Sequence, residues 1–112
     1  MTISQQINTI NYAQIFKTSI RIDDFRKTIM MNSNATENFI SSRLITTLKC
    51  ATQKKNESYQ LQIINDNSLS RKNNKEVIRE TKSLSIIIQR YHEKLIFDIV
   101  KMITYDVVLR MS

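Results

Sequence analysis

The sequence offers few side chains that could carry out catalysis. His92 is the only histidine, Cys50 is the only cysteine, and Asp23-Asp24 is the only pair of adjacent acids. Zinc sites need several His or Cys ligands at short spacing, and a nucleophilic triad needs a histidine base. We interpret His92 as a partly exposed helical side chain, Cys50 as a small buried hydrophobe and the acid pair as a helix cap. No catalytic, cofactor-binding or metal-ligating residue is predicted, and the chain is not expected to be an enzyme.

A group of basic residues is the other chemistry-bearing feature. The chain carries 17 Lys and Arg against 10 Asp and Glu, a formal net charge of +7. If the ends of two predicted helices meet, five cations could converge and neutralise several phosphates. A solvated surface explains the same residues without a ligand. The candidate anion or nucleic-acid contacts are Lys54, Lys55, Arg71, Lys72 and Lys75.

Glycine and proline are both absent from the 112 residues. Glycine supplies positive-φ turns and close backbone approach, whereas proline supplies rigid stops. A glycine-rich phosphate loop is therefore excluded, and tight hairpins and strained catalytic turns are difficult to build. The composition favours helices joined by links rich in Asn and Ser.

The spacing of apolar residues predicts three short helices in the first half of the chain. They lie over about 3–19, around 22–29, and from Asn34 to Lys55. Asn34 and Glu37 are spaced as a capping box for the third helix. The alternation of Tyr59, Leu61 and Ile63 with glutamines favours a strand instead, which could form a short hairpin with 43–51. The polar segment 65–74 is predicted to be an exposed loop.

The second half of the chain predicts one long helix over 75–112. Asn73 and Glu76 are spaced as its capping box, and an apolar seam follows at spacings of three and four residues. Asp98 and Asp106 interrupt the seam. A helix of this length, on the order of 54 Å, has more apolar surface than the short helices can cover. The predicted partner interface is Leu84, Ile88, Tyr91, Leu95, Ile99, Met102 and Leu109.

These observations predict an all-α protein with three or four short helices and one long amphipathic C-terminal helix. It would form a single domain, with a short-helix region over 1–64, the polar loop over 65–74 and the long helix beyond it. The expected function is that of a non-enzymatic interaction protein, a subunit or adaptor that binds a protein partner or a second copy of itself. A basic helical protein that binds nucleic acid is the alternative.

A basic chain without glycine or proline that ends in a long amphipathic helix resembles the coiled-coil stalk and accessory proteins of bacterial type III secretion and flagellar export. The resemblance covers residues 75–111 and implies a partner in a protein-export machine, with a role in virulence. The N-terminus has no signal-peptide pattern, no segment is apolar enough to span a bilayer, and Cys50 has no partner for an intrachain disulfide. A cytoplasmic location is therefore expected.

Overall fold

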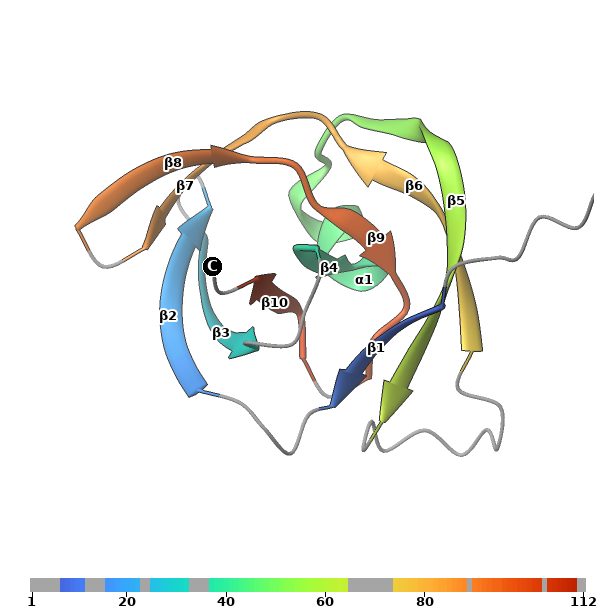
Figure 1. The fold of residues 1–112 in the computed structure, drawn as a ribbon. Coiled ribbons are helices and arrows are strands. Elements are labelled where there is room, and N and C mark those ends of the chain that lie inside the picture. Colours follow the sequence, from blue (N-terminus) through green and yellow to red (C-terminus); the bar gives the residue numbers. More distant parts are fainter. Residues whose placement is uncertain are drawn as a thin grey trace, which may run out of the picture.

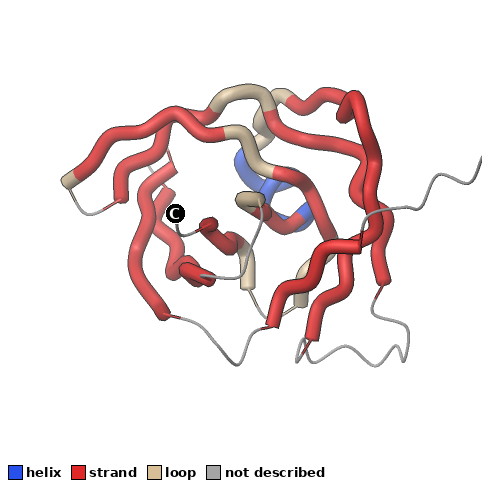
Figure 2. Tube along the Cα trace, viewed as in Figure 1, coloured by secondary structure: helices blue, strands red, loops and turns tan. Residues whose placement is uncertain are grey.

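The protein is built almost entirely from β-strands (Figures 1 and 2). The computed structural model describes residues 7–11, 16–22, 25–32, 37–64, 74–88, 90–103 and 105–110. Within this part of the chain, one short helix, α1 (Ser42–Leu48), follows the fourth strand. The strands are β1 (Ile7–Asn11), β2 (Phe16–Ile22), β3 (Phe25–Asn32), β4 (Phe39–Ser41), β5 (Thr52–Ile64), β6 (Asn74–Thr81), β7 (Leu84–Ile88), β8 (Tyr91–Leu95), β9 (Asp98–Val100) and β10 (Val107–Arg110).

The ten strands form one sheet in the order β1-β5-β6-β9-β4-β10-β3-β2-β7-β8. The sheet curves around the interior, so the β5–β6 hairpin and the β7–β8 hairpin lie on opposite sides of the molecule (Figure 1). β10 pairs in parallel with β3 and antiparallel with β4, which places the last described strand in the middle of the sheet. Segments far apart in sequence therefore meet at the centre of the fold.

Alternating burial explains why these segments form strands. Successive side chains of a strand point to opposite faces. In β2, Ile20 and Ile22 are buried on either side of the exposed Arg21, and in β5, Leu61 and Ile63 are buried on either side of an exposed glutamine. Each such strand buries one face and leaves the other polar.

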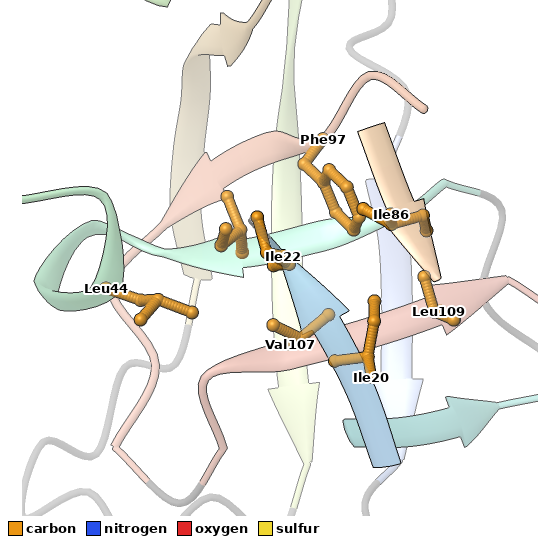
Figure 3. Close-up of a cluster of buried hydrophobic side chains, with 8 residues drawn as sticks. Ile20, Ile22, Leu44, Ile86, Phe97, Val107 and Leu109 are labelled. Atoms are coloured by element: carbon orange, nitrogen blue, oxygen red, sulfur yellow. The ribbon is translucent and has the colours of Figure 1, made fainter. Parts of the chain in front are cut away.

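Two clusters of buried side chains form the core. The larger one brings together residues from Ile20 in β2 to Leu109 in β10, and Figure 3 shows its side chains converging from separate strands and from α1. The smaller one lies against β5, β6 and β9. The larger cluster contains Ile20, Ile22, Ile40, Leu44, Ile86, Phe97, Val107 and Leu109. The smaller cluster contains Phe39, Leu61, Ile63, Val77, Val100, Met102 and Val108.

The predicted all-α architecture is wrong, and so is its long C-terminal helix. The described residues between 74 and 110 form the five strands β6 to β10. Runs of β-branched residues such as Ile86–Ile88 and Val107–Val108 suit a pleated sheet, where their restricted χ1 angles cost little. The apolar residues recur every three or four positions because several short strands follow one another in the sequence.

The shorter predicted helices are wrong as well. The predicted helices over about 3–19 and around 22–29 are replaced by β1, β2 and β3, and α1 alone remains of the third. The N-cap is Ser41 instead of Asn34, which lies outside the described residues, as do Asp23, Asp24 and 65–73. The alternative strand is present, but β5 pairs with β6 and β1 instead of with 43–51.

The absence of glycine does not prevent sheet formation. Among the described residues, Lys49 is the one non-glycine residue at positive φ, at 54°, and it caps the C-terminus of α1. The described two-residue links between strands, 82–83 and 96–97, need no left-handed residue. No helix in the described part of the chain is long and apolar enough to cross a membrane.

Candidate functional site

A charged network lies between β5, β6 and β9. Lys55 Nζ lies 2.8 Å from Asp98 Oδ1 and 3.2 Å from Glu80 Oε1. The hydroxyl of Tyr59 donates to Asp98 Oδ2, and Gln53 Nε2 donates to Glu80 Oε2 at 2.6 Å. Only 4% of the Asp98 side chain is exposed, so this acid is buried together with its partners. The network therefore joins three strands through side chains in addition to the backbone ladder.

The backbone explains why these side chains meet. Glu80 and Asp98 are paired residues in the antiparallel register of β6 and β9. The pairing of β5 with β6 shifts between Lys54 and Tyr59, which marks a β-bulge or a similar irregularity. A bulge redirects the side chains beside it. Lys55 lies within this irregular part of β5 and reaches across β6 to Asp98.

The charges of the network support one another. Burial alone would lower the pKa of Lys55, but the hydrogen bonds and charges of Asp98 and Glu80 outweigh it and raise that pKa. The hydrogen bond from Gln53 lowers the pKa of Glu80 more than burial raises it, and Lys55 lowers it further. Lys55 and Glu80 are therefore both ionised near neutral pH.

This arrangement differs from a pair of carboxylates that performs acid–base catalysis. In such a pair, two carboxylates lie together without an intervening cation and share one proton. Here the ammonium group of Lys55 lies within hydrogen-bond distance of both Glu80 and Asp98, so the two acids are not an isolated pair. The network links three strands, and within the described residues no group of three or more His, Cys, Asp or Glu could hold a metal ion.

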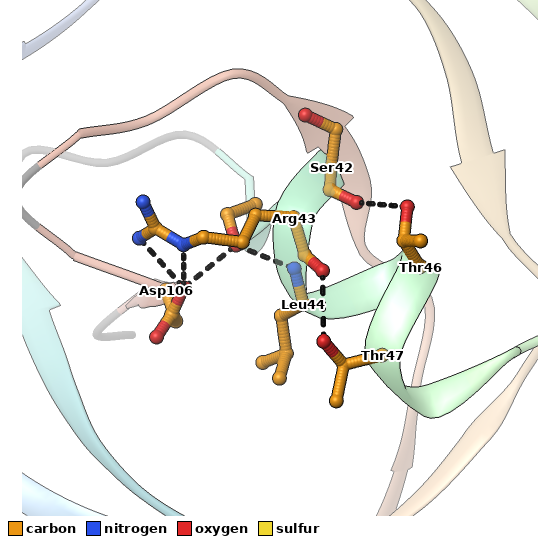
Figure 4. Close-up of polar contacts among 7 residues, drawn as sticks. Ser42, Arg43, Leu44, Thr46, Thr47 and Asp106 are labelled. Carbon is orange, nitrogen blue, oxygen red and sulfur yellow. Dashed lines mark hydrogen bonds and ion pairs between the residues drawn. The ribbon is translucent and has the colours of Figure 1, made fainter.

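A second polar cluster ties the start of α1 to the segment before β10 (Figure 4). Arg43 donates to Asp106 Oδ1 from Nε at 3.0 Å and from Nη2 at 2.8 Å. The buried Ser41 hydroxyl donates to the same oxygen at 2.8 Å and accepts from the backbone N–H of Leu44 at 3.0 Å. Ser41 is thus both the N-cap of the helix and a contact to Asp106.

The predicted partner interface is divided among several strands. Leu109 is buried in the larger core cluster, and Leu84, Ile88, Leu95 and Ile99 pack against that cluster. Met102 belongs to the smaller cluster, whereas Tyr91 is 70% exposed on β8. These residues do not form a helical seam, since they lie on separate strands and one loop. Their role in partner binding stays a prediction.

The five predicted cations do not form one described group. Arg71 and Lys72 lie outside the described residues. Lys54 is exposed on β5, Lys75 lies on β6 opposite Leu61, and the ammonium group of Lys55 is held by two carboxylates. Anion binding by this set stays a prediction.

Neither the lone histidine nor the lone cysteine is among the residues named for the two networks. His92 is exposed on β8 instead of on a helix. Cys50 is half-buried just after α1 and forms no disulfide.

The sequence reasoning missed Lys55, Glu80 and Asp98 as one network, and Ser41 and Asp106 as another. The sequence contains one indication of these networks, because Asp98 and Asp106 interrupt an apolar pattern. Acids among buried apolar residues need a cation or a hydrogen-bond donor. Their partners are far away in sequence, 43 residues for Lys55 and Asp98, so spacing along the chain could not identify them.

The fold and the two polar clusters describe a small domain built from one curved β-sheet, and comparison with known families shows which family it belongs to. The model of the PEG10/RTL1 protease domain matches residues 28–112, which is most of the chain. The chain therefore belongs to the PEG10/RTL1 protease domain family, which has the retroviral-type aspartic protease fold. A comparison with curated proteins finds no match.

This membership overturns the earlier functional predictions. The chain is not similar to a coiled-coil secretion or flagellar export protein, and it is neither a helical adaptor nor a helical nucleic-acid-binding protein. The prediction that the chain is not an enzyme is also wrong on this evidence, because its family is a protease domain. That prediction rested on motifs for zinc, histidine and glycine-rich sites, whereas aspartic proteases use carboxylates alone.

Proposed function

We propose that the chain is an aspartic-protease-like domain that acts on polypeptide. The match of residues 28–112 to the PEG10/RTL1 protease domain is the observation that carries this proposal. The strand-built fold supports it, because side chains carried on the strands of a curved sheet are positioned more precisely than side chains on loops (Figure 1).

The two polar clusters limit which acids can react. Glu80 and Asp98 both contact Lys55, and Asp106 is bound by Arg43, so we assign these acids to supporting the fold. The other acids of the described residues, Glu37, Glu57, Glu76 and Glu93, are exposed. The remaining acids of the chain are Asp23, Asp24 and Asp66. If the chain cleaves polypeptide with carboxylates, these last two groups contain the acids that are left for that role.

A cleavage assay tests the proposal. The purified chain is incubated with a reduced, unfolded protein and with a peptide mixture from acidic to neutral pH. Mass spectrometry then identifies new peptide termini, and equilibrium binding of a labelled unfolded polypeptide is measured in parallel. The heat-denatured chain is the control. We expect the native chain alone to act on polypeptide. The absence of both cleavage and saturable binding over the whole pH range would contradict the proposal.

Variants of the acids then locate the chemistry. Glu80→Gln and Asp106→Asn should retain the cleavage pattern of the native chain wherever they remain folded, because we assign these acids to structural contacts. Asn replacements of Asp23, Asp24 and Asp66 test the acids outside the described residues. Loss of cleavage in a folded variant identifies the reacting carboxylate.

We further propose that the chain resides in the cytoplasm. The sequence contains a single cysteine and therefore no intrachain cysteine pair, a cysteine usage typical of proteins in a reducing compartment. Mass spectrometry of the chain purified from its own cells under alkylating conditions tests it.

A further inference from the structure

The β7–β8 hairpin ends the sheet, and β8 has a neighbour on one side only among the described strands (Figure 1). Four of the five residues of β8 are exposed, and Tyr91 is exposed by 70%. The free edge of a strand presents every second backbone N–H and C=O group to any further strand that pairs with it. An extended polypeptide can therefore be added at this edge.

The outer face of this end of the sheet is basic. The strand register places Arg21 of β2 opposite Ile87 of β7, and Ile87 opposite His92 of β8. The next row along the hairpin pairs Ser85 with Lys94. Opposite residues and every second residue of a strand share a face. This outer face thus carries two permanent cations, Arg21 and Lys94, around the half-buried Ile87.

The acidic residue of β8 belongs to the other face. Glu93 is paired with Ile86, which is buried in the core, and Ile86 is paired in turn with Ile22 of β2. The rows alternate, so Glu93 lies on the core side of the hairpin and stays exposed only because β8 is at the edge. In the rows formed by Arg21, Ile87 and His92 and by Ser85 and Lys94, the register therefore places no acid on the outer face of β2, β7 and β8.

A shallow pocket lies at this place. It has a volume of about 330 Å³ and is lined by Arg21 together with residues 85–87 and 92–94 of the hairpin. The lining combines two cations, Arg21 and Lys94, with the apolar Ile86 and Ile87 and one acid, Glu93. Because the cations outnumber the acid, the pocket is suited to a side chain that has an aliphatic stem and a carboxylate end. Glutamate has this form.

We propose that the β8 edge binds an acidic polypeptide segment in the extended conformation. The segment pairs with β8 as an additional strand, and its glutamate side chains lie over the outer face, where they meet Lys94 and the positive field of Arg21. A polypeptide fits better than a nucleic acid because the strand edge supplies backbone donors and acceptors in the spacing of a β-ladder. The inference goes beyond the proposed action on polypeptide, since the edge can bind whether or not cleavage occurs.

Fluorescence anisotropy of a labelled peptide tests the proposal. The probe is an extended peptide of about ten residues in which glutamate and valine alternate, a length that covers an edge strand. The variant Arg21→Glu/Lys94→Glu reverses the two cations of the outer face. The matched control, Lys82→Glu/Lys101→Glu, makes the same change of net charge at exposed residues outside the pocket. Circular dichroism confirms that both variants are folded.

We expect the pocket variant to bind the probe at least about tenfold more weakly and the control variant to bind it as the native chain does. A probe with N-methyl groups on alternate backbone nitrogens should also bind about tenfold more weakly, because it cannot complete the strand ladder. Equal binding by the two variants, or full binding of the methylated probe, would overturn the proposal. Displacement of the probe by a single-stranded oligonucleotide at equal charge concentration would overturn it too.

Discussion

Glu80 of β6 and Asp98 of β9 are direct cross-strand partners, and the ammonium group of Lys55 lies within hydrogen-bond distance of both carboxylates. Like charges placed opposite each other in a sheet are destabilising. Lys55 reverses that effect, because it adds a cation between the two acids. One side chain of β5 therefore supplies the cation of this strand junction, beside the hydrogen bonds from Gln53 and Tyr59.

The first prediction concerns this cation. Lys55→Met should lower the free energy of unfolding by about 3 kcal/mol, because removal of one partner of a buried ion pair leaves uncompensated charge. Lys54→Met is the control, since Lys54 is the exposed neighbour on β5, and surface changes of this kind stay within about 0.5 kcal/mol. Urea denaturation measures both. Equal losses in the two variants would show that Lys55 has no special role.

The second prediction concerns pH. The pKa of Glu80 is lowered, so its contribution to stability is complete above its ordinary value of 4.5 and is lost as pH falls through the folded-state pKa. The pKa of Lys55 is raised, so its contribution is complete below 10.5 and is lost as pH rises through the folded-state pKa. Both contributions are present between these limits.

Urea midpoints measured from pH 3 to pH 11 test this dependence. Glu80→Gln should lose less stability than the native chain when the pH falls below 4.5, since the variant has no carboxylate to protonate at this site. If the urea midpoints of the native chain and the variant fell by the same amount below pH 4.5, the role of Glu80 would be contradicted.

The third prediction concerns the start of α1. Ser41→Ala should lower the free energy of unfolding by about 1–2 kcal/mol, because the hydroxyl caps the helix and also donates to Asp106. The control is Ser42→Ala at the exposed next position, which should change stability by less than about 0.5 kcal/mol. Thermal denaturation followed by circular dichroism measures both. A larger loss for the Ser42 variant would contradict the assignment of the cap.

The fourth prediction concerns the larger core cluster. Phe97 is completely buried among side chains of several strands (Figure 3), so Phe97→Ala should lower the free energy of unfolding by about 3–5 kcal/mol. Ile96→Ala, at a neighbouring residue that is 48% exposed, should have a much smaller effect. If chemical denaturation ranked the two variants the other way, the assignment of the core would be wrong.

Parts of the fold are readable in the sequence. The alternation of Tyr59, Leu61 and Ile63 indicates a strand, and β5 contains it. Asp98 and Asp106 are visible as acids within apolar segments, and both prove to be held by cations. Each of these signals is local, and each reports only whether a residue is buried or exposed.

The C-terminal half shows why local signals were insufficient. Several short strands in succession place apolar residues at intervals that also fit a helix, so the pattern from Leu84 to Leu109 had two interpretations. The absence of glycine seemed to favour the helix. Strand pairing decided the outcome, because neighbouring segments bury more apolar surface as a sheet around a shared core than as one rod.

By itself, the sequence determined the charge of +7, the single cysteine and histidine, and the alternation within individual strands. Only the tertiary structure decided the strand order, the insertion of β10 between β3 and β4, and the meeting of Lys55 with Glu80 and Asp98, which lie 25 and 43 residues away. The physical reason is that backbone ladders and buried ion pairs join residues that are distant along the chain. Their energy depends on which segments become neighbours, and no local pattern contains that information.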